Sequence, residues 1–185
     1  MRMIKVVAFG AVALFTSLVM AEKAPESVER LAPTLKAWGE NPIVVAAVKA
    51  QNAKGESLDQ IKQRDASWRA TSGVDDFMRS LLESDTAKEL MKLETSKPYF
   101  FELFLMDSQG ANVAMTNKTS DYWQGDEAKF TESFKGGSGA IHIGDVEFDE
   151  SAQAYLVQIS VPVMDGGSAV GAMTIGVNVD KLEAK

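Results

Sequence analysis

Two aromatic residues lie among carboxylate and amide side chains in one short segment of the chain. Tyr122 and Trp123 follow Asp121 and precede Gln124 and Asp126. Aromatic walls with a few convergent polar groups are what a pocket for a small ligand requires. Aromatic faces and carboxylates both attract cations, so a cationic or amine ligand suits this composition best. Together with a nearby asparagine, the candidate ligand-binding residues are Asn117, Asp121, Tyr122, Trp123, Gln124 and Asp126.

Several of these residues also have a purely structural explanation. Trp123 can close the end of the hydrophobic core as readily as it can contact a ligand. Asp126 precedes Glu-Ala-Lys, a good helix start, so capping of a short helix running to about Ser133 is the favoured interpretation. Asn117 and Thr119 can bind a ligand or bond their own backbone as loop residues do. For Thr119 we favour the loop role, and for Asn117 both roles stay open.

Residue types for nucleophilic or metal chemistry are scarce. The chain has no cysteine and one histidine, His142, so thiolate catalysis, thiolate metal sites and disulfides are excluded. It also lacks the Gly-x-Ser-x-Gly motif of a serine nucleophile. His142 lies beside Ile141 and Ile143, where an exposed position on a strand explains it. The acidic residues within 145–150 lack the spacing of a calcium loop and suit a charged strand edge. We therefore expect no enzyme, no bound metal and no cofactor.

The elements that position these residues divide the chain into two halves, and the first half is helical. Ser57 with Gln60, and Thr86 with Glu89, have the spacing of capping boxes, which mark helix starts near positions 58 and 87. Glycines at 55 and 73 punctuate the segments, and a proline at 98 ends the last one. We expect helices at about 26–38, 42–53, 58–71, 74–84 and 87–95.

The second half follows the period of a β-sheet. Residues 155–163 and 169–179 alternate between apolar and mixed side chains, as strands with one dry face do. Residues 99–106 are apolar on both faces, which is typical of a central strand. Turn residues at 107–110 and 165–167 indicate antiparallel hairpins. We expect five strands, at 99–106, 111–116, 140–148, 154–164 and 168–179.

One long insertion interrupts the series of expected strands. Residues 117–139 separate the second and third expected strands, and loops of this length in a small domain are usually functional. Gln158, Ser160 and Thr174 lie on the mixed faces of neighbouring strands. They either form the floor of a pocket beneath this loop or face water, as half-solvated antiparallel strands commonly do.

The first residues have the order of a secretory signal peptide. Arg2 and Lys5 are basic, residues 6–19 are almost wholly apolar, and Ala21 is the small residue before a cleavage site. The apolar stretch is shorter than the about 20 residues that span a membrane. We expect cleavage after Ala21 and a mature periplasmic domain at 22–185, with an uncleaved anchor as the alternative.

Charge and length limit the partners of this domain. The chain has 19 Lys and Arg against 26 Asp and Glu, and two of the basic residues belong to the predicted signal peptide. The rest contains no cluster of basic residues, so nucleic acid and anionic lipid are not expected partners. The mature length suffices for one domain whose core needs no disulfides.

Four segments follow the expected helices: FELFLMDSQG at 101–110, NKTSDYWQGDE at 117–127, VPV at 161–163 and GAMTIGVN at 171–178. With these segments, the order of helices, strand–turn–strand, long insertion and three more strands resembles the extracytoplasmic PAS-like sensor domains called Cache. The resemblance extends over about residues 25–182. It implies an α+β fold, with N-terminal helices (about 25–96) packed on a five-stranded antiparallel PAS-like sheet (about 99–180).

The resemblance also implies a function. We expect a periplasmic sensory module that binds a small ligand, such as an amine or amino acid. Cache domains usually lie between two transmembrane helices, and no second apolar span follows the last strand here, so signalling would require contact with a membrane-bound sensor protein. The alternative is a ligand-free interaction or structural module of the cell envelope, with an exposed apolar patch and no internal pocket. A homodimer through the N-terminal helices is also open, because the apolar residues within 43–48 suit either a dimer face or the core.

Overall fold

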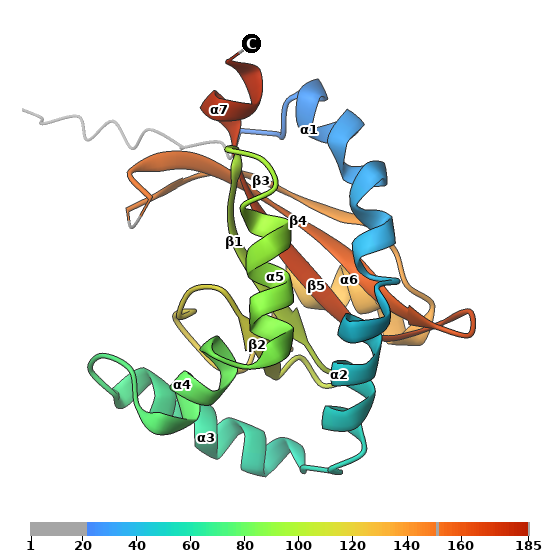
Figure 1. Cartoon of the computed structure of the whole chain (residues 1–185), viewed down its shortest axis with the longest axis vertical. Coiled ribbons are helices and arrows are strands. Elements are labelled where there is room, and N and C mark those ends of the chain that lie inside the picture. Colours follow the sequence, from blue (N-terminus) through green and yellow to red (C-terminus); the bar gives the residue numbers. More distant parts are fainter. Residues whose placement is uncertain (1–21, 151, 185) are drawn as a thin grey trace, which may run out of the picture.

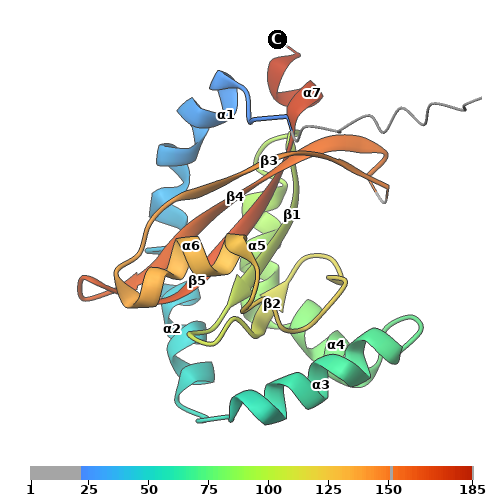
Figure 2. The same ribbon diagram turned by 180° about the vertical axis from the view of Figure 1, so that it is seen from behind.

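A five-stranded antiparallel sheet separates two unequal layers in this protein (Figure 1). The computed structural model describes residues 22–150 and 152–184. The predicted signal peptide at 1–21 and its cleavage site lie outside the described residues. The N-terminal helices cover one face of the sheet, and helix α6 crosses the other face, as the view from behind shows (Figure 2). The predicted α+β fold class is therefore confirmed.

The helices before the sheet begin and end close to the predicted positions. Their bounds are α1 Glu26–Leu31, the 3₁₀ helix η1 Ala32–Trp38, α2 Pro42–Asn52, α3 Leu58–Ala70, α4 Asp76–Leu82 and α5 Asp85–Glu94. Within the described part of the chain, no helix is long and apolar enough to cross a membrane.

The two predicted capping boxes had different outcomes. Ser57 and Gln60 form the reciprocal pair at the start of α3, as predicted. The pair of Thr86 and Glu89 was wrong, because Ser84 caps α5 by accepting a hydrogen bond from the backbone N–H of Ala87. Serine and threonine are both good N-cap residues, and the helix begins two positions earlier than the Thr86 pair predicted.

The strands also match the prediction closely. They are β1 Phe100–Met106, β2 Asn112–Met115, β3 His142–Asp149, β4 Ala154–Asp165 and β5 Ser168–Asn178, in the spatial order β2-β1-β5-β4-β3. Strand β1 lies between β2 and β5, so its two apolar faces belong to an interior strand, as expected. The short helix α7, Val179–Glu183, follows β5.

The long insertion contains a helix of its own. Helix α6 spans Ala128–Phe134 and continues into the 3₁₀ turn η2, Lys135–Gly137. A short helix was predicted here, but the assignment of Asp126 as its cap was wrong. Glu127 occupies the N-cap position, and Asp126 is exposed one residue earlier.

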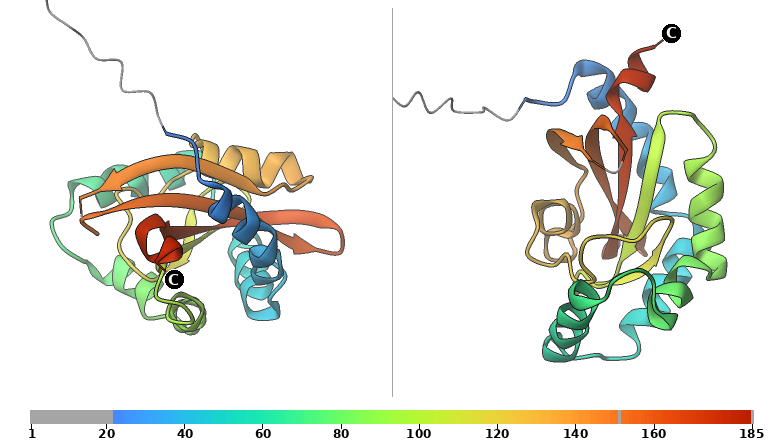
Figure 3. Two further views of the ribbon diagram at one scale, coloured as in Figure 1. Left: turned by 90° about the horizontal axis from the view of Figure 1, so that it is seen from above. Right: turned by 90° about the vertical axis from the view of Figure 1, so that its left-hand side faces the viewer.

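Two clusters of apolar side chains stabilise the domain. The larger one joins the sheet to α1, α2 and α5, and its side chains on the central strands include Leu103, Ile159 and Ile175. The smaller one joins α3 and α4 to the insertion and centres on Trp68 and Tyr122. Trp68 is 2% exposed and anchors this cluster. Seen from the side, α3 and α4 lie at one end of the sheet while α6 lies on the face opposite α5 (Figure 3).

Candidate functional site

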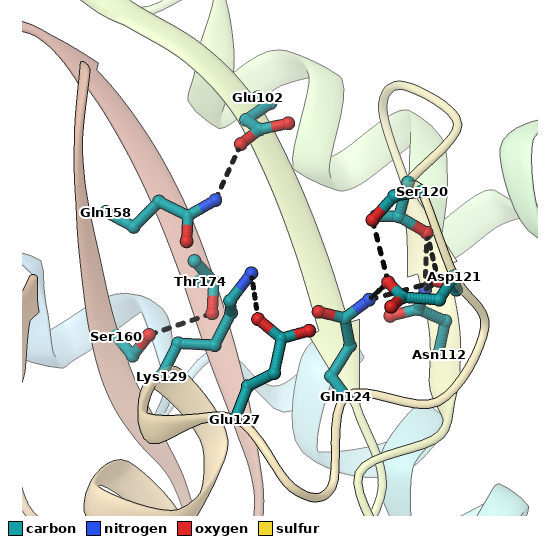
Figure 4. Close-up of polar contacts among 11 residues, drawn as sticks. Glu102, Asn112, Ser120, Asp121, Gln124, Glu127, Lys129, Gln158, Ser160 and Thr174 are labelled. Atoms are coloured by element: carbon teal, nitrogen blue, oxygen red, sulfur yellow. Dashed lines mark hydrogen bonds and ion pairs between the residues drawn. The ribbon is translucent and has the colours of Figure 1, made fainter. Parts of the chain in front are cut away.

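The sheet face beneath α6 carries polar side chains on all three central strands. Ser160 on β4 and Thr174 on β5 are fully buried and share a hydrogen bond of 2.8 Å between their hydroxyl groups. The register places them side by side in one row across the sheet, next to Phe104 on β1 and His142 on β3. Buried hydroxyls need partners, and here they satisfy each other (Figure 4).

A second polar row lies beside the first one. The side chain of Gln158 on β4 donates a hydrogen bond of 3.0 Å to the Glu102 carboxylate on β1, across the intervening β5. Gly176 makes this contact possible, because a Cβ atom at that position would lie 2.7 Å from Cγ of Glu102. Burial raises the pKa of the Glu102 carboxyl, while the Gln158 hydrogen bond opposes this shift.

Helix α6 brings charged side chains to the same face. The Lys129 ammonium lies 2.9 Å from a carboxylate oxygen of Glu127 and 5.4 Å from the centre of the Phe104 ring. It also lowers the pKa of Glu102 through its positive charge, although less than burial raises it. Figure 4 shows Lys129 and Glu127 between the polar rows of the sheet and the side chain of Gln124.

A cavity of about 370 Å³ opens between α6, β3 and β4. Its lining includes Glu127, Lys129, His142, Asp145, Glu147 and Gln158. A smaller cavity of about 110 Å³ shares Asp145, Glu147 and Gln158 with it and reaches Glu102. The two cavities lie next to each other along the edge strand β3, and together they are called the groove here. His142, interpreted from the sequence as an exposed strand position, is half-buried and lines this groove.

The groove can hold a small molecule with a positively charged group. Its lining contains one lysine, Lys129, and five carboxylates, from Glu102, Glu127, Asp145, Glu147 and Asp149. A ligand ammonium would find hydrogen-bond acceptors there, and Lys129 could bind a ligand carboxylate. Within 22–150 and 152–184, no group of three or more His, Asp and Glu is arranged to hold a metal ion.

The aromatic residues predicted to bind a ligand point in different directions. Tyr122 is 1% exposed and packs in the smaller core, with ring centres 5.7 Å from Trp68 and 5.4 Å from Phe77. Trp123 is half-buried, and its indole N–H donates a hydrogen bond of 2.8 Å to the carbonyl of Gln109 in the β1–β2 turn. Trp123 thus occupies the core-closing position that the sequence left open, and neither ring lines the groove under α6.

Helix α3 holds this part of the insertion in place. The Asp65 carboxylate is 3% exposed and accepts hydrogen bonds from the backbone N–H groups of Tyr122 and Trp123. Lys118 donates hydrogen bonds to the carbonyls of Thr71 and Gly73 just after α3, where cations are favoured by the helix dipole. The insertion therefore follows a fixed path from β2 to α6.

The polar members of the predicted site form a second group, next to the groove. The amide of Gln124 donates to the backbone and side-chain oxygens of Asp121, and Asn112 donates to the carbonyl of Asp121 and the hydroxyl of Thr119. Among the described residues, the amide oxygens of Asn112 and Gln124 are buried without a hydrogen-bond partner. Buried acceptors in this state are open to a water or a ligand.

The remaining predicted residues lie apart from this group. Asn117 is exposed and donates a hydrogen bond of 3.3 Å to the carbonyl of Phe101. Asp126 is exposed before α6. The structure thus brings Asp121 and Gln124 together and places Tyr122, Trp123, Asn117 and Asp126 elsewhere. Whether any of the six binds a ligand stays a prediction.

Sequence reasoning missed Glu102 and Lys129, which define the groove. One signal pointed to Glu102, because it is the single charged residue in the otherwise apolar strand β1, and charged residues in such strands are rarely buried without a partner. Lys129 carries no comparable signal in the sequence. Its role depends on how α6 lies across the sheet.

Among solved structures, the chain is similar to sensor domains of histidine kinases and chemoreceptors. It is 13% identical to the V. cholerae histidine kinase DctB sensor domain, covering 85% of this chain and 50% of that one, with a TM-score of 0.43. It is 12% identical to the sensory domain of the Campylobacter jejuni chemoreceptor Tlp3, covering 85% and 64%, with a TM-score of 0.43.

A third structure is the ligand-binding domain of the Pseudomonas aeruginosa amino acid chemoreceptor PctC in complex with GABA, at 12% identity, 84% and 63% coverage and a TM-score of 0.38. The chain thus spans between half and two thirds of the length of these three domains. No protein-family model and no curated protein matches it. Because these similarities are low, the candidate site is argued from the chain's own residues alone.

Proposed function

We propose that this protein is a Cache-type sensory module of the periplasm that binds a small amine or amino acid. The ligand would occupy the groove between α6, β3 and β4, and its role is binding rather than catalysis. The observation that supports this proposal is a cavity of about 370 Å³ whose lining includes the charged and polar side chains of Glu127, Lys129 and Gln158. Sites for small ligands combine these two properties.

The charges of the groove select the ligand class. Glu127 holds Lys129 at 2.9 Å, and both side chains are accessible from the cavity. An amino acid can replace the contact between Glu127 and Lys129. Its carboxylate then binds Lys129 in place of the Glu127 carboxylate, and its ammonium binds the acidic side chains of the groove. A simple amine would use the carboxylates and leave the ion pair intact.

A thermal-shift screen of the protein against amino acids and amines tests this proposal. A ligand at about 100 times its Kd should add about 2.7 kcal/mol, a shift of several degrees for a domain of this size. Lys129→Gln should weaken the binding of amino acids at least tenfold and the binding of simple amines much less. Lys36→Gln, which removes an exposed lysine of η1, is the matched control. A ligand that stabilises Lys129→Gln and Glu127→Gln as much as the wild type would contradict the proposal that the groove is the site.

The signal would pass by contact with a membrane-bound partner. At the far end of the β3–β4 hairpin, Phe148 and Tyr155 are about half exposed and stack edge to face with ring centres 5.3 Å apart. They offer an apolar contact on the strands that line the groove. This pair also supports the second candidate function, a ligand-free interaction module, which a negative screen and loss of partner binding in Phe148→Ser would favour.

A homodimer through the N-terminal helices could use only those apolar side chains of α2 that are not buried in the core. Val44 and Val48 are fully buried against the sheet, whereas Ile43 on the same helix is 47% exposed. Ile43 is therefore the side chain that a dimer face on α2 could use. Sedimentation of the wild type and Ile43→Ser at several concentrations tests this arrangement, and a monomer throughout would contradict it.

A further inference from the structure

A second cavity of about 430 Å³ lies at α3 and α4, at the end of the sheet away from β3. Glu56 lies just before α3, and Gln60, Arg64 and Ser67 follow on one side of that helix at spacings of four and three residues. Gln63, Asp75 and the aromatic rings of Trp68 and Phe77 complete the lining. This cavity shares no residue with the groove under α6.

The central feature of this cavity is an ion pair whose hydrogen bonds are incomplete. The guanidinium of Arg64 lies 3.6 Å from a carboxylate oxygen of Glu56, which is longer than a hydrogen bond. Within the part of the chain that the structure describes, Nε of Arg64 and the other carboxylate oxygen of Glu56 are both buried without a hydrogen-bond partner. The Arg64 and Glu56 side chains as a whole are 38% and 26% exposed, so a ligand can reach this ion pair and supply the missing hydrogen-bond partners.

Aromatic rings fix the position of the arginine. The Arg64 guanidinium lies 4.2 Å from the centre of the Phe77 ring and 6.0 Å from that of Tyr122. Stacking holds the planar group without using its N–H donors, which stay available at the edge of the plane. The arginine is thus oriented before a ligand binds, and little of the binding free energy is lost in ordering it.

We propose that this cavity is a second small-molecule site, which takes a zwitterion of amino acid size. The ligand carboxylate accepts hydrogen bonds from Arg64, and the ligand ammonium donates to Glu56. The amide of Gln60 and the hydroxyl of Ser67 contact the polar backbone or side chain of the ligand. The ligand thereby satisfies both unpartnered atoms and separates the two charges of the loose ion pair. This site does not depend on the groove under α6.

NMR titration of the 15N-labelled protein tests the proposal, because backbone amides report where a ligand binds. The probes are the twenty common L-amino acids, with acetate and methylammonium as single-charge controls, at up to about 10 mM, where a millimolar site is mostly occupied. We expect saturable shifts at the amides of α3 and α4 with at least one amino acid. Acetate and methylammonium should give weaker shifts, because each satisfies one charge.

Variants distinguish this site from general effects on the helix. Arg64→Gln and Glu56→Gln should each lower the affinity measured from the shifts at least tenfold. Arg64→Lys should bind more tightly than Arg64→Gln but less tightly than the wild type. Asp59→Asn, which removes an exposed charge from the first turn of α3, is the matched control and should bind like the wild type. Spectra of the unbound variants that match the wild type outside the cavity establish that they are folded.

Two results would overturn the proposal. One is the lack of saturable shifts at α3 and α4 with every amino acid, even where amides of α6 and β3 respond, which would support the groove alone. The other is binding at α3 that both Arg64→Gln and Glu56→Gln leave unchanged. The wild-type shift map decides the first result without any variant, so a variant that fails to fold does not obstruct the test.

Discussion

The two faces of the sheet differ in what covers them and in what they carry. The face toward α1, α2 and α5 is wholly apolar on its central strands, with Leu103, Ile159 and Ile175 fully buried. The face toward α6 carries Glu102, Gln158 and the Ser160–Thr174 hydroxyl pair. Successive residues of each strand point to opposite faces, so one strand contributes to both surfaces. The difference indicates that one face mainly provides stability, while the other carries the polar groups beside the proposed site.

The largest expected effect comes from shortening a buried side chain on the face covered by α1, α2 and α5. Leu103→Ala should lower the free energy of unfolding by about 2–5 kcal/mol, because it leaves a cavity in the larger core. Denaturant titration measures the loss. A matched change on the other face, Ser160→Ala, should cost about 1 kcal/mol. Equal losses for the two variants would remove the distinction between the faces.

An intermediate effect is expected where α3 holds the insertion. Asp65→Ala removes the acceptor for the N–H groups of Tyr122 and Trp123, and two unsatisfied donors should cost about 1–3 kcal/mol. Hydrogen exchange at these two amides should accelerate. Arg69→Gln, which removes the exposed partner of Asp65, should cost less than about 1 kcal/mol. Slow exchange at both amides in Asp65→Ala would show that the insertion is held in another way.

A smaller effect should separate hydrogen bonding from packing beneath α6. Ser160→Ala or Thr174→Val alone leaves a buried hydroxyl unpaired and should cost about 1 kcal/mol or slightly more. The double variant should recover much of that loss, because both polar groups are gone. A double-mutant cycle measures this coupling. Additive losses would mean that the two hydroxyls do not stabilise each other.

The smallest effect concerns the carboxyl of Glu102. Because burial raises its pKa in the folded state, this state binds the proton more tightly than the unfolded chain. Its contribution to stability is therefore largest at low pH and declines as the pH rises through the folded pKa. Glu102→Gln keeps an acceptor for Gln158 and should gain less than about 1 kcal/mol at pH 7 and nothing at pH 4. A gain that is equal at both pH values would exclude charge burial as its cause.

The sequence predicted the elements better than the site. Helix and strand periods repeat over many residues, so their positions differ from the structure by a few residues. A single cap, such as Ser84 in place of Thr86, depends on one hydrogen bond and is harder to choose. The direction of side chains within the insertion has no period, so Tyr122 could equally have lined a pocket or the core. Glu102 and Lys129 meet because α6 crosses the sheet, which no local pattern specifies.

The order of the strands also determines when the domain can be completed. Strands β3, β4 and β5 are joined by hairpins, whereas β1 pairs with β5, for example Met106 with Ala172, across most of the length of the sheet region. Local pairs form faster than distant ones, so we expect the β3–β5 meander to precede the docking of β1. A chain that emerges N-terminus first keeps its helices and β1 without their final partner until β5 arrives. The larger core can thus close only when β5 is available to pair with β1.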